Sequence, residues 1–195
     1  MKVTLASSNK GKLAEFQQLL SGLNFDVVPQ SEFQVPDAIE NGLSFVENAI
    51  IKARHASKLT GLPAIADDSG LEVDFLNGAP GIYSSRFSGE NATDEKNNQR
   101  LLSLLQEAEE NERTARFQCL LVYMRHPEDP TPIICQGTWE GLITLSPDGK
   151  NGFGYDPLFY IPEFGCTSAQ LEKTQKNKVS HRGKAMAQLL EKLSR

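Results

Sequence analysis

The order of the expected strands and helices limits what this chain of 195 residues can fold into. Early in the chain, residues 2–6 and 24–30 have the pattern of strands, while residues 13–23 repeat apolar side chains at helical spacing. Later, apolar β-rich runs follow one another over residues 114–124, 133–136 and 138–145. Alternating elements followed by clustered strands predict an α/β fold with a mixed β-sheet.

Further helices are expected from residue 43 to about residue 58, after an N-cap at Thr93, and near the C-terminus. Thr167 and Gln170 have the spacing of a capping box and predict a short helix. No internal repeat, low-complexity segment or linker divides the chain, so we expect a single domain over residues 1–195.

The charge and the cysteines exclude several classes of protein. The net charge of −5 argues against a nucleic-acid binder, which would present a basic face, but is compatible with a small phosphate site. The N-terminal residues run directly into a strand, and no apolar run has the length of a membrane span. Three widely spaced cysteines match neither a zinc site nor a disulfide framework. We therefore expect a cytoplasmic protein.

The run from Ala64 to Asp74 is the most informative stretch of the chain. An apolar approach over residues 62–66 predicts a buried strand, and it ends abruptly on Asp67, Asp68, Ser69 and Gly70. Such residues suit a solvated turn, yet paired carboxylates also suit Mg²⁺, which prefers oxygen ligands. The long, glycine-punctuated segment that follows, residues 77–89, favours a binding site.

A polar loop, Ser7-Ser8-Asn9-Lys10-Gly11-Lys12, lies between the first expected strand and the first expected helix. The N-terminus of the helix and two lysines favour a bound anion at this position. The first glycine of a Walker A loop is missing, and the alternative is a strand-to-helix turn with a serine cap and solvated lysines. We favour a phosphate site here.

Two later segments have the composition of ligand-binding regions. In Gly152-Phe153-Gly154-Tyr155-Asp156-Pro157, the aromatic side chains could stack on a purine, although an aromatic corner of the core is an equal alternative. His181 and Arg182 place positive charge at the start of the last helix, where the helix dipole opposes it, so a bound anion or acceptor-rich ligand would explain them. A surface cap is the alternative for His181. Lys52 and Glu40 are ambiguous between solvated charges and ligands.

Six motifs occur in order along nearly the whole chain: Ser-Ser-Asn-Lys-Gly-Lys at 7–12, Glu-Asn-Ala-Ile-Ile-Lys-Ala at 47–53, Asp-Asp-Ser-Gly-Leu at 67–71, Pro-Gly-Ile-Tyr-Ser-Ser-Arg-Phe-Ser-Gly at 80–89, Phe-Gly-Tyr-Asp-Pro at 153–157 and Ser-His-Arg-Gly-Lys-Ala at 180–185. Together they resemble the inosine triphosphate pyrophosphatase (Ham1-like) family, and segment 125–132 is similar to its bacterial branch, which acts on dITP and XTP. The resemblance implies an elongated mixed β-sheet flanked by helices, two lobes with a central substrate cleft, and a homodimer. It implies Mg²⁺-dependent hydrolysis of ITP, dITP and XTP to the monophosphate and pyrophosphate, which removes deaminated purine nucleotides from the pool.

The resemblance also implies roles for single residues. Asp68 corresponds to the catalytic base and a metal ligand, Glu40 to a second metal-binding acid, and Asp67 to a further candidate ligand. Contacts to the substrate are implied for Ser7, Ser8, Asn9, Lys10, Gly11, Lys12, Lys52, Ser69, Phe153, Gly154, Tyr155, Asp156, Lys176, His181 and Arg182. The pair Ser7-Ser8 departs from the Thr-Gly pair frequent in the family, and Ile39 leaves Glu40 as the one acid at its position.

Our hypothesis is an attack on the α-phosphorus by a water that Asp68 orients or deprotonates. Donors from Lys176, His181 or Arg182 would recognise the 6-keto group of the base and leave an adenine amino group badly paired. Two alternatives stay open: a nucleotide sensor without turnover, and a pyrophosphatase for other nucleotides such as dTTP or UTP. A sensor would not need the acids Glu40, Asp67 and Asp68, so their presence together argues against that alternative.

Overall fold

The chain forms two compact units, each with its own core. The computed structural model describes residues 2–7, 9–20 and 25–194. Unit 1 contains Met1–Asp68, Cys119–Gly137 and Arg182–Arg195, and unit 2 contains Ser69–Gln118 and Thr138–His181. Three long strands contribute residues to both units: β3 (Ala64–Val73), β4 (Thr114–Met124) and β5 (Ile133–Ile143).

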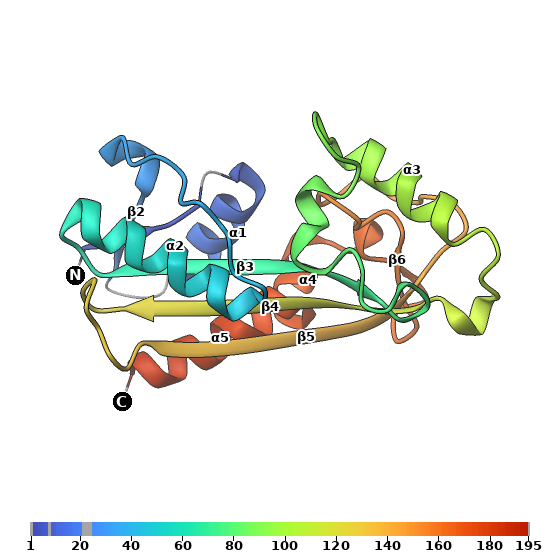
Figure 1. Ribbon diagram of the computed structural model, residues 1–195. Helices are drawn as coiled ribbons and strands as arrows, with labels where there is room; N and C mark the ends of the chain where they lie inside the picture. The colour runs from blue at the N-terminus through green and yellow to red at the C-terminus, as the bar shows by residue number, and fades with distance from the viewer. Residues whose placement is uncertain (1, 8, 21–24, 195) are drawn as a thin grey trace. The chain divides into compact units, whose positions relative to one another are not determined.

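Seven strands form one sheet in the order β2-β1-β3-β4-β5-β6-β7 (Figure 1). The four short strands are β1 (Lys2–Leu5), β2 (Asp26–Pro29), β6 (Phe159–Ile161) and β7 (Cys166–Thr167). β1 is parallel to both β2 and β3, whereas β6 is antiparallel to both β5 and β7. Parallel pairs require crossover connections and antiparallel pairs do not, which matches the early helices and the later run of strands. The prediction of an α/β fold with a mixed sheet is confirmed.

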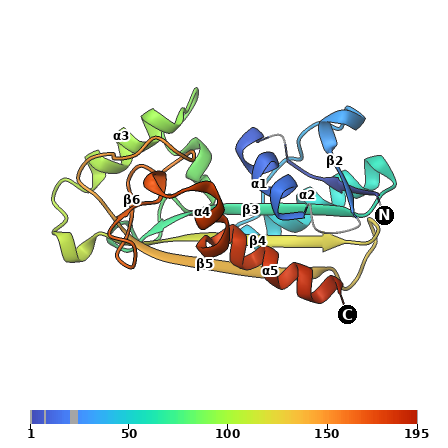
Figure 2. The same ribbon diagram turned by 180° about the vertical axis from the view of Figure 1, so that it is seen from behind.

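Helices from distant parts of the chain cover the two faces of the sheet in unit 1. α1 (Lys10–Leu20) and α5 (His181–Leu193) lie on one face, and α2 (Phe45–Thr60) lies on the other, as opposite views show (Figures 1 and 2). α2 is bounded by an N-cap at Ser44 and by Gly61 in the left-handed conformation. The core beneath α1 and α5 includes Val3, Leu5, Phe16, Ile65, Leu121 and Met186.

Two α-helices lie within unit 2, α3 (Asp94–Leu104) and α4 (Lys173–Val179). The expected N-cap is confirmed, since the Thr93 hydroxyl accepts a hydrogen bond from Lys96 N–H at 3.2 Å. The expected capping box is also confirmed, and it opens a short 3-10 helix, Ser168–Gln170. α4 was not expected from the sequence. The core of this unit includes Leu71, Leu101, Phe117, Trp139 and Phe159.

Two expected strand boundaries were wrong. β3 does not end at Ala66 but continues through both aspartates to Val73, because each carboxylate has a lysine partner and can therefore be buried within a strand. β5 is one continuous strand rather than two, since Gly137 is buried and remains within it. The interpretation of residues 67–70 as a solvated turn is therefore excluded.

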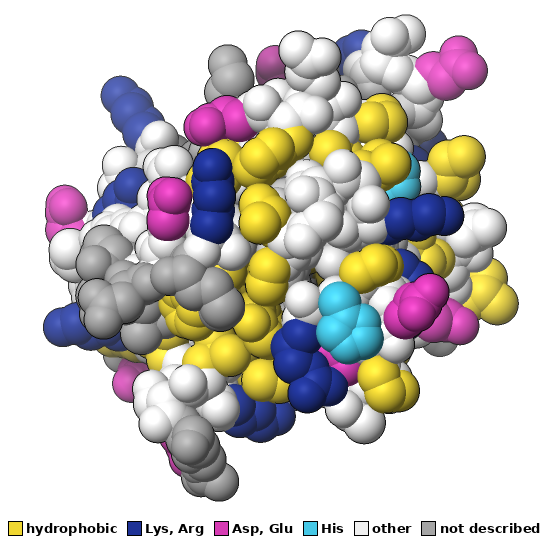
Figure 3. Space-filling view, turned by 90° about the vertical axis from the view of Figure 1, so that its left-hand side faces the viewer, with side chains coloured by type: hydrophobic (Ala, Val, Ile, Leu, Met, Phe, Trp, Pro, Cys, Tyr) yellow, Lys and Arg dark blue, Asp and Glu magenta, His cyan; other side chains and the backbone are white. Residues whose placement is uncertain are grey.

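The face of the molecule drawn in Figure 3 has a mixed surface, on which Lys and Arg side chains are separated by acidic and apolar ones. The described residues form no continuous basic patch on this face. In the part of the chain that the structure describes, every helix is too short or too polar to cross a membrane.

Candidate active site

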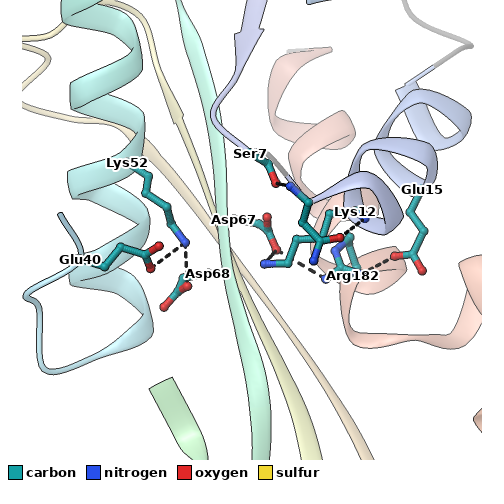
Figure 4. Close-up of polar contacts among 9 residues, drawn as sticks. Ser7, Lys12, Glu15, Glu40, Lys52, Asp67, Asp68 and Arg182 are labelled. Atoms are coloured by element: carbon teal, nitrogen blue, oxygen red, sulfur yellow. Dashed lines mark hydrogen bonds and ion pairs between the residues drawn. The ribbon is translucent and has the colours of Figure 1, made fainter. Parts of the chain in front are cut away.

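Asp67 and Asp68 point to opposite sides of β3, and each meets its own basic partners (Figure 4). An Asp67 carboxylate oxygen lies 2.9 Å from Lys12 Nζ and 3.5 Å from Arg182 Nη2. Asp68 lies 2.7 Å from Lys52 Nζ. Consecutive strand residues point to opposite faces of a sheet, so the extended backbone itself separates the two carboxylates.

The side of β3 that carries Asp67 holds a buried ion cluster. Arg182, the second residue of α5, also donates to the carboxylate of Glu15 on α1. Only 1% of Asp67 and 2% of Arg182 is exposed. Burial alone would raise the pKa of Asp67, but the charges of Lys12, Arg182 and Lys52 outweigh it and lower the pKa below its ordinary 3.8. Asp67 is therefore ionised, and its charge holds Lys12 and Arg182.

The side of β3 that carries Asp68 holds a smaller cluster around Lys52 of α2. Lys52 Nζ donates to Asp68 at 2.7 Å and to Glu40 at 3.0 Å. Burial raises the pKa of Asp68 and the nearby Glu40 adds to this, against the charge of Lys52. Burial disfavours charged Lys52, yet the carboxylates around it raise its pKa. The pKa values of Asp68 and Lys52 are both raised because Lys52 divides its charge among several acids. The charge of Lys52 therefore offsets only part of the effect of burial on Asp68.

Glu40 and Asp68 are the acids that fit a divalent cation. Both carboxylates reach the same Lys52 Nζ, so their oxygens face a common point. The second oxygen of Asp68, Oδ2, is buried and has no hydrogen-bond partner among the described residues. A buried acceptor needs a partner, and Mg²⁺ is usually held by one or two carboxylates together with substrate phosphates. Asp67 does not join this pair, and no cluster of three Asp, Glu, His or Cys side chains suited to a metal occurs among the described residues.

The loop between β1 and α1 carries the residues expected to bind phosphate. Asn9 Oδ1 accepts a hydrogen bond from Lys12 N–H at 3.0 Å, and Ser7 Oγ accepts one from Asn9 N–H at 3.3 Å. Asn9, rather than a serine, therefore caps α1, and the Lys12 side chain is held by an ion pair instead of being solvated. Gly11 lies in the first turn of α1, whereas Ser8 and the side chain of Lys10 lie outside the described residues.

A third cluster lies in unit 2 around the buried Asp156. Its carboxylate accepts hydrogen bonds from Lys176 Nζ at 2.5 Å, from Phe153 N–H at 2.9 Å and from the Ser168 hydroxyl. Lys176 Nζ also lies 5.3 Å from the centroid of the Phe153 ring, within cation–π range. Asp156 therefore bonds both the backbone of Phe153 and the ammonium group that lies over the Phe153 ring.

Three further residues that were expected to contact the substrate lie in unit 2 outside the Asp156 cluster. Tyr155 is buried in the core and its hydroxyl donates to Ser84 C=O at 2.8 Å, while burial raises its pKa. An aromatic corner of the core is therefore the right description for Tyr155. His181 is buried as well, and its ring stacks on Phe117 with centroids 4.8 Å apart, which excludes a surface cap. Ser69 follows Asp68 in β3 and is half-buried.

Two supporting residues were missed from the sequence. Glu15 lies three residues after Lys12 and beside the fully buried Phe16, so an acid next to the apolar face of the helix was the available signal. Ser168 is fully buried and bonds Asp156, and nothing in the sequence pattern distinguishes it.

Gly152→Ala is expected to disturb the Asp156 cluster. A Cβ at Gly152 would lie 2.0 Å from the anchored Oδ2 of Asp156, and the backbone φ of +78° is itself unfavourable for alanine. Gly165 supplies the matched control, because its φ is +64° and nothing lies within 4 Å of an added Cβ. Backbone strain should cost either variant about 1–2 kcal/mol, and the clash should add about 1–3 kcal/mol for Gly152→Ala alone. Urea unfolding of both proteins measures the difference, and equal losses of stability would contradict it.

The lowered pKa of Asp67 predicts a pH-dependent contribution to stability. Below the ordinary value of 3.8, the unfolded chain binds a proton that folded Asp67 still rejects, so the free energy of unfolding falls as the pH falls from about 5 towards 2. Asp74 and Asp129 also have pKa values lowered by hydrogen bonds from arginines, so the wild type alone does not isolate Asp67. We expect a shallower fall for Asp67→Asn in urea unfolding at stepped pH. Parallel curves for the two proteins would refute the assignment.

A mixed seven-stranded sheet, in which an inner strand carries separate ion clusters on its two faces, defines an α/β protein organised around β3. The chain belongs to the Ham1 family, whose model matches residues 3–192.

Individual relatives match almost the whole chain. The dITP/XTP pyrophosphatase of Vibrio cholerae serotype O1 is 60% identical over 188 residues, which cover 96% of this chain and 94% of the relative. The dITP/XTP pyrophosphatase of Escherichia coli O157:H7 is 57% identical over 192 residues, or 98% of each chain. The solved structure of a HAM1 protein from Coxiella burnetii matches with a TM-score of 0.93 at 53% identity, and covers 100% of this chain and 98% of that one. The family resemblance seen in the motifs is thus confirmed.

Proposed function

We propose that this chain is a Mg²⁺-dependent nucleoside triphosphate pyrophosphatase that hydrolyses ITP, dITP and XTP to the monophosphate and pyrophosphate. The names of two relatives that match nearly the full length support this activity. The observation that carries the proposal is Lys52, held between Glu40 and Asp68 beside a buried Asp68 oxygen that has no partner among the described residues. A charged lysine next to two acids suits a phosphate and a cation bound together.

Unit 1 would bind the triphosphate in this proposal. Phosphate oxygens would contact the loop 7–12, which includes a helix N-terminus, and the ammonium group of Lys52. Glu40 and Asp68 are the residues that would hold Mg²⁺. When bound, the ion supplies positive charge that offsets the charge on the phosphate oxygens.

Asp68 would act as the base. It orients a water and takes its proton, the water oxygen bonds to the α-phosphorus, and the bond from that phosphorus to the bridging oxygen breaks as pyrophosphate leaves. Burial raises the pKa of Asp68 in the absence of a cation, and a bound Mg²⁺ would lower it. Asp67 suits the role poorly because its pKa is lowered, and we assign it the task of holding Lys12 and Arg182.

Unit 2 would select the base. Phe153 would stack on the purine, and Lys176 and His181 would donate to its 6-keto group. Arg182 is a further candidate donor, since a guanidinium carries five N–H groups and can hold Glu15 and also bind a ligand. An adenine presents an amino group at the same position, so its pairing with these donors would be poor.

The proposal also includes the oligomeric state, the location and the kind of substrate. The protein would be a homodimer in the cytoplasm, and it would act on free nucleotides and not on nucleic acid. The mixed surface of Figure 3, without a continuous basic patch among its described residues, supports the last point. Light scattering after size-exclusion chromatography tests the dimer, and a monomer at micromolar concentration would contradict it.

An assay of products tests the activity itself. The protein is incubated with Mg²⁺ and separately with ITP, XTP, ATP, GTP and dTTP, and pyrophosphate and phosphate are measured apart. Pyrophosphate from ITP and XTP, lost on addition of EDTA, is the expected result. Tight ITP binding without product would favour a sensor, and pyrophosphate mainly from dTTP would favour a different substrate class.

A further inference from the structure

Two side chains of α3 hold the backbone of Gly154. The Asp94 carboxylate accepts a hydrogen bond from Gly154 N–H at 2.7 Å, and the Asn98 amide donates one to Gly154 C=O at 3.0 Å. Asp94 is the first residue of α3 and Asn98 follows one turn later, so both project from the same face of the helix. One helix thus fixes both polar backbone groups of this glycine.

The helix that makes these bonds is itself firmly anchored in unit 2. Asn97, the residue before Asn98, is buried and donates to the carbonyls of Ser84 and Ser85, while its own oxygen accepts from Ser88 N–H at 2.8 Å. Leu101 of the same helix is fully buried in the core. α3 can therefore act as a fixed support for the segment that it bonds.

Side-chain packing does little to hold Gly154 in place. Its φ is +64°, and nothing lies within 4 Å of the position that a Cβ would occupy. A pocket of 440 Å³ opens beside it, lined by α3 and by residues that include Pro147, Phe153 and Gly154. With open space at its side, Gly154 is held by the two hydrogen bonds from α3 and by its chain neighbour Tyr155, which is buried in the core.

Phe153 lies directly before Gly154 and is restrained from the other direction. Its N–H donates to Asp156 at 2.9 Å, and Lys176 lies over its ring. Asp156 holds the backbone N–H of Phe153, and Asp94 and Asn98 hold the backbone of the residue that follows it. The backbone is therefore held at Phe153 and at the residue after it, and the ring itself is contacted by Lys176.

We propose that Asp94 and Asn98 are positioning residues for base recognition, which set the Phe153 ring through the backbone of Gly154. The inference rests on the proposed function, in which Phe153 stacks on the purine. Neither residue belongs to the cluster of the proposed base, in which Asp68 and Glu40 meet Lys52. Their loss should weaken binding of the nucleotide base and leave the chemical step nearly unchanged.

The test compares Asp94→Ala with Glu95→Ala. Both changes remove one carboxylate from the first turn of α3, but only Asp94 bonds Gly154. We expect Asp94→Ala to raise KM for ITP and the Kd for IMP by about three- to tenfold, the effect of one lost hydrogen bond, with kcat within about twofold of wild type. Glu95→Ala should leave all three constants unchanged. Asp94→Asn keeps an acceptor oxygen and should restore much of the loss.

Asn98 provides an independent arm of the same test. Asn98→Asp places a carboxylate against the carbonyl of Gly154, and it should weaken IMP binding more than Asn98→Ala does. Gln99→Ala, on the next residue of the helix, is the control. Thermal unfolding of each variant is measured first, and binding is compared only among proteins that are folded at the assay temperature.

The outcomes separate this inference from the proposed function. If the wild type releases pyrophosphate from ITP, but Asp94→Ala and Glu95→Ala have equal KM and Kd values, the positioning role is overturned alone. A fall in kcat with unchanged KM and Kd would overturn it as well. A wild type that neither turns over ITP nor binds IMP would overturn both.

Discussion

Asp68→Asn is expected to lower the kcat for ITP by about 10²- to 10⁴-fold, the range for loss of a general base. The amide keeps the shape of the side chain but carries no negative charge to accept a proton from water. It also removes one of the two carboxylates that meet at Lys52. Pyrophosphate release at saturating ITP and Mg²⁺ measures kcat directly.

The matched control for this change is Asp26→Asn. Asp26 is an exposed residue at the start of β2 in unit 1, so the same loss of charge is made away from the Asp68 cluster. We expect wild-type turnover from Asp26→Asn. If Asp68→Asn also turned over at nearly the wild-type rate, Asp68 would be neither the base nor an essential ligand.

Arg182→Met is expected to lower the free energy of unfolding by about 3–5 kcal/mol, the cost of breaking a buried ion cluster by removing one partner. Arg182 is 2% exposed and contacts the carboxylates of Glu15 and Asp67, both of which are also buried. Methionine fills similar space but supplies no charge, so two carboxylates lose compensation at once. Urea unfolding at pH 7 measures the loss.

Three further proteins, a lysine control, Glu15→Gln and the double variant, make this test specific to the cluster. Lys58→Met removes a positive charge from an exposed position of α2 and should change stability by less than about 0.5 kcal/mol. Glu15→Gln combined with Arg182→Met removes one of the stranded charges, and it should be less destabilised than the sum of the two single changes. Strict additivity would show that Glu15 and Arg182 do not interact.

The sequence predicted most of the fold because the signals for it are local. Thr93 and the pair Thr167 and Gln170 cap helical turns through bonds to residues three positions away, and such spacing is visible in a sequence. The predicted end of β3 was wrong because the contacts that extend this strand are not local. Asp67 and Asp68 stay within a strand because of lysines 55 and 16 positions away, and no local rule brings these residues together.

The same distinction applies to the site. The family resemblance selected Glu40 and Asp68 as metal ligands and Lys52 as a phosphate contact, and the structure brings these three side chains together. The resemblance also grouped Asp67 with the metal-binding acids, although the pleat of β3 turns its carboxylate to the other face. Glu15 was missed because its partner Arg182 lies 167 residues away, and only the packing of α1 beside α5 reveals the pair.

Hydrolysis of ITP in water enriched in ¹⁸O, followed by mass spectrometry of the products, is the most direct test of attack at the α-phosphorus. If the water held by Asp68 bonds to that phosphorus, the label enters IMP and the pyrophosphate stays unlabelled. Label in the pyrophosphate, with unlabelled IMP, would place the attack on the β-phosphorus and contradict the mechanism proposed for Asp68, Glu40 and Lys52.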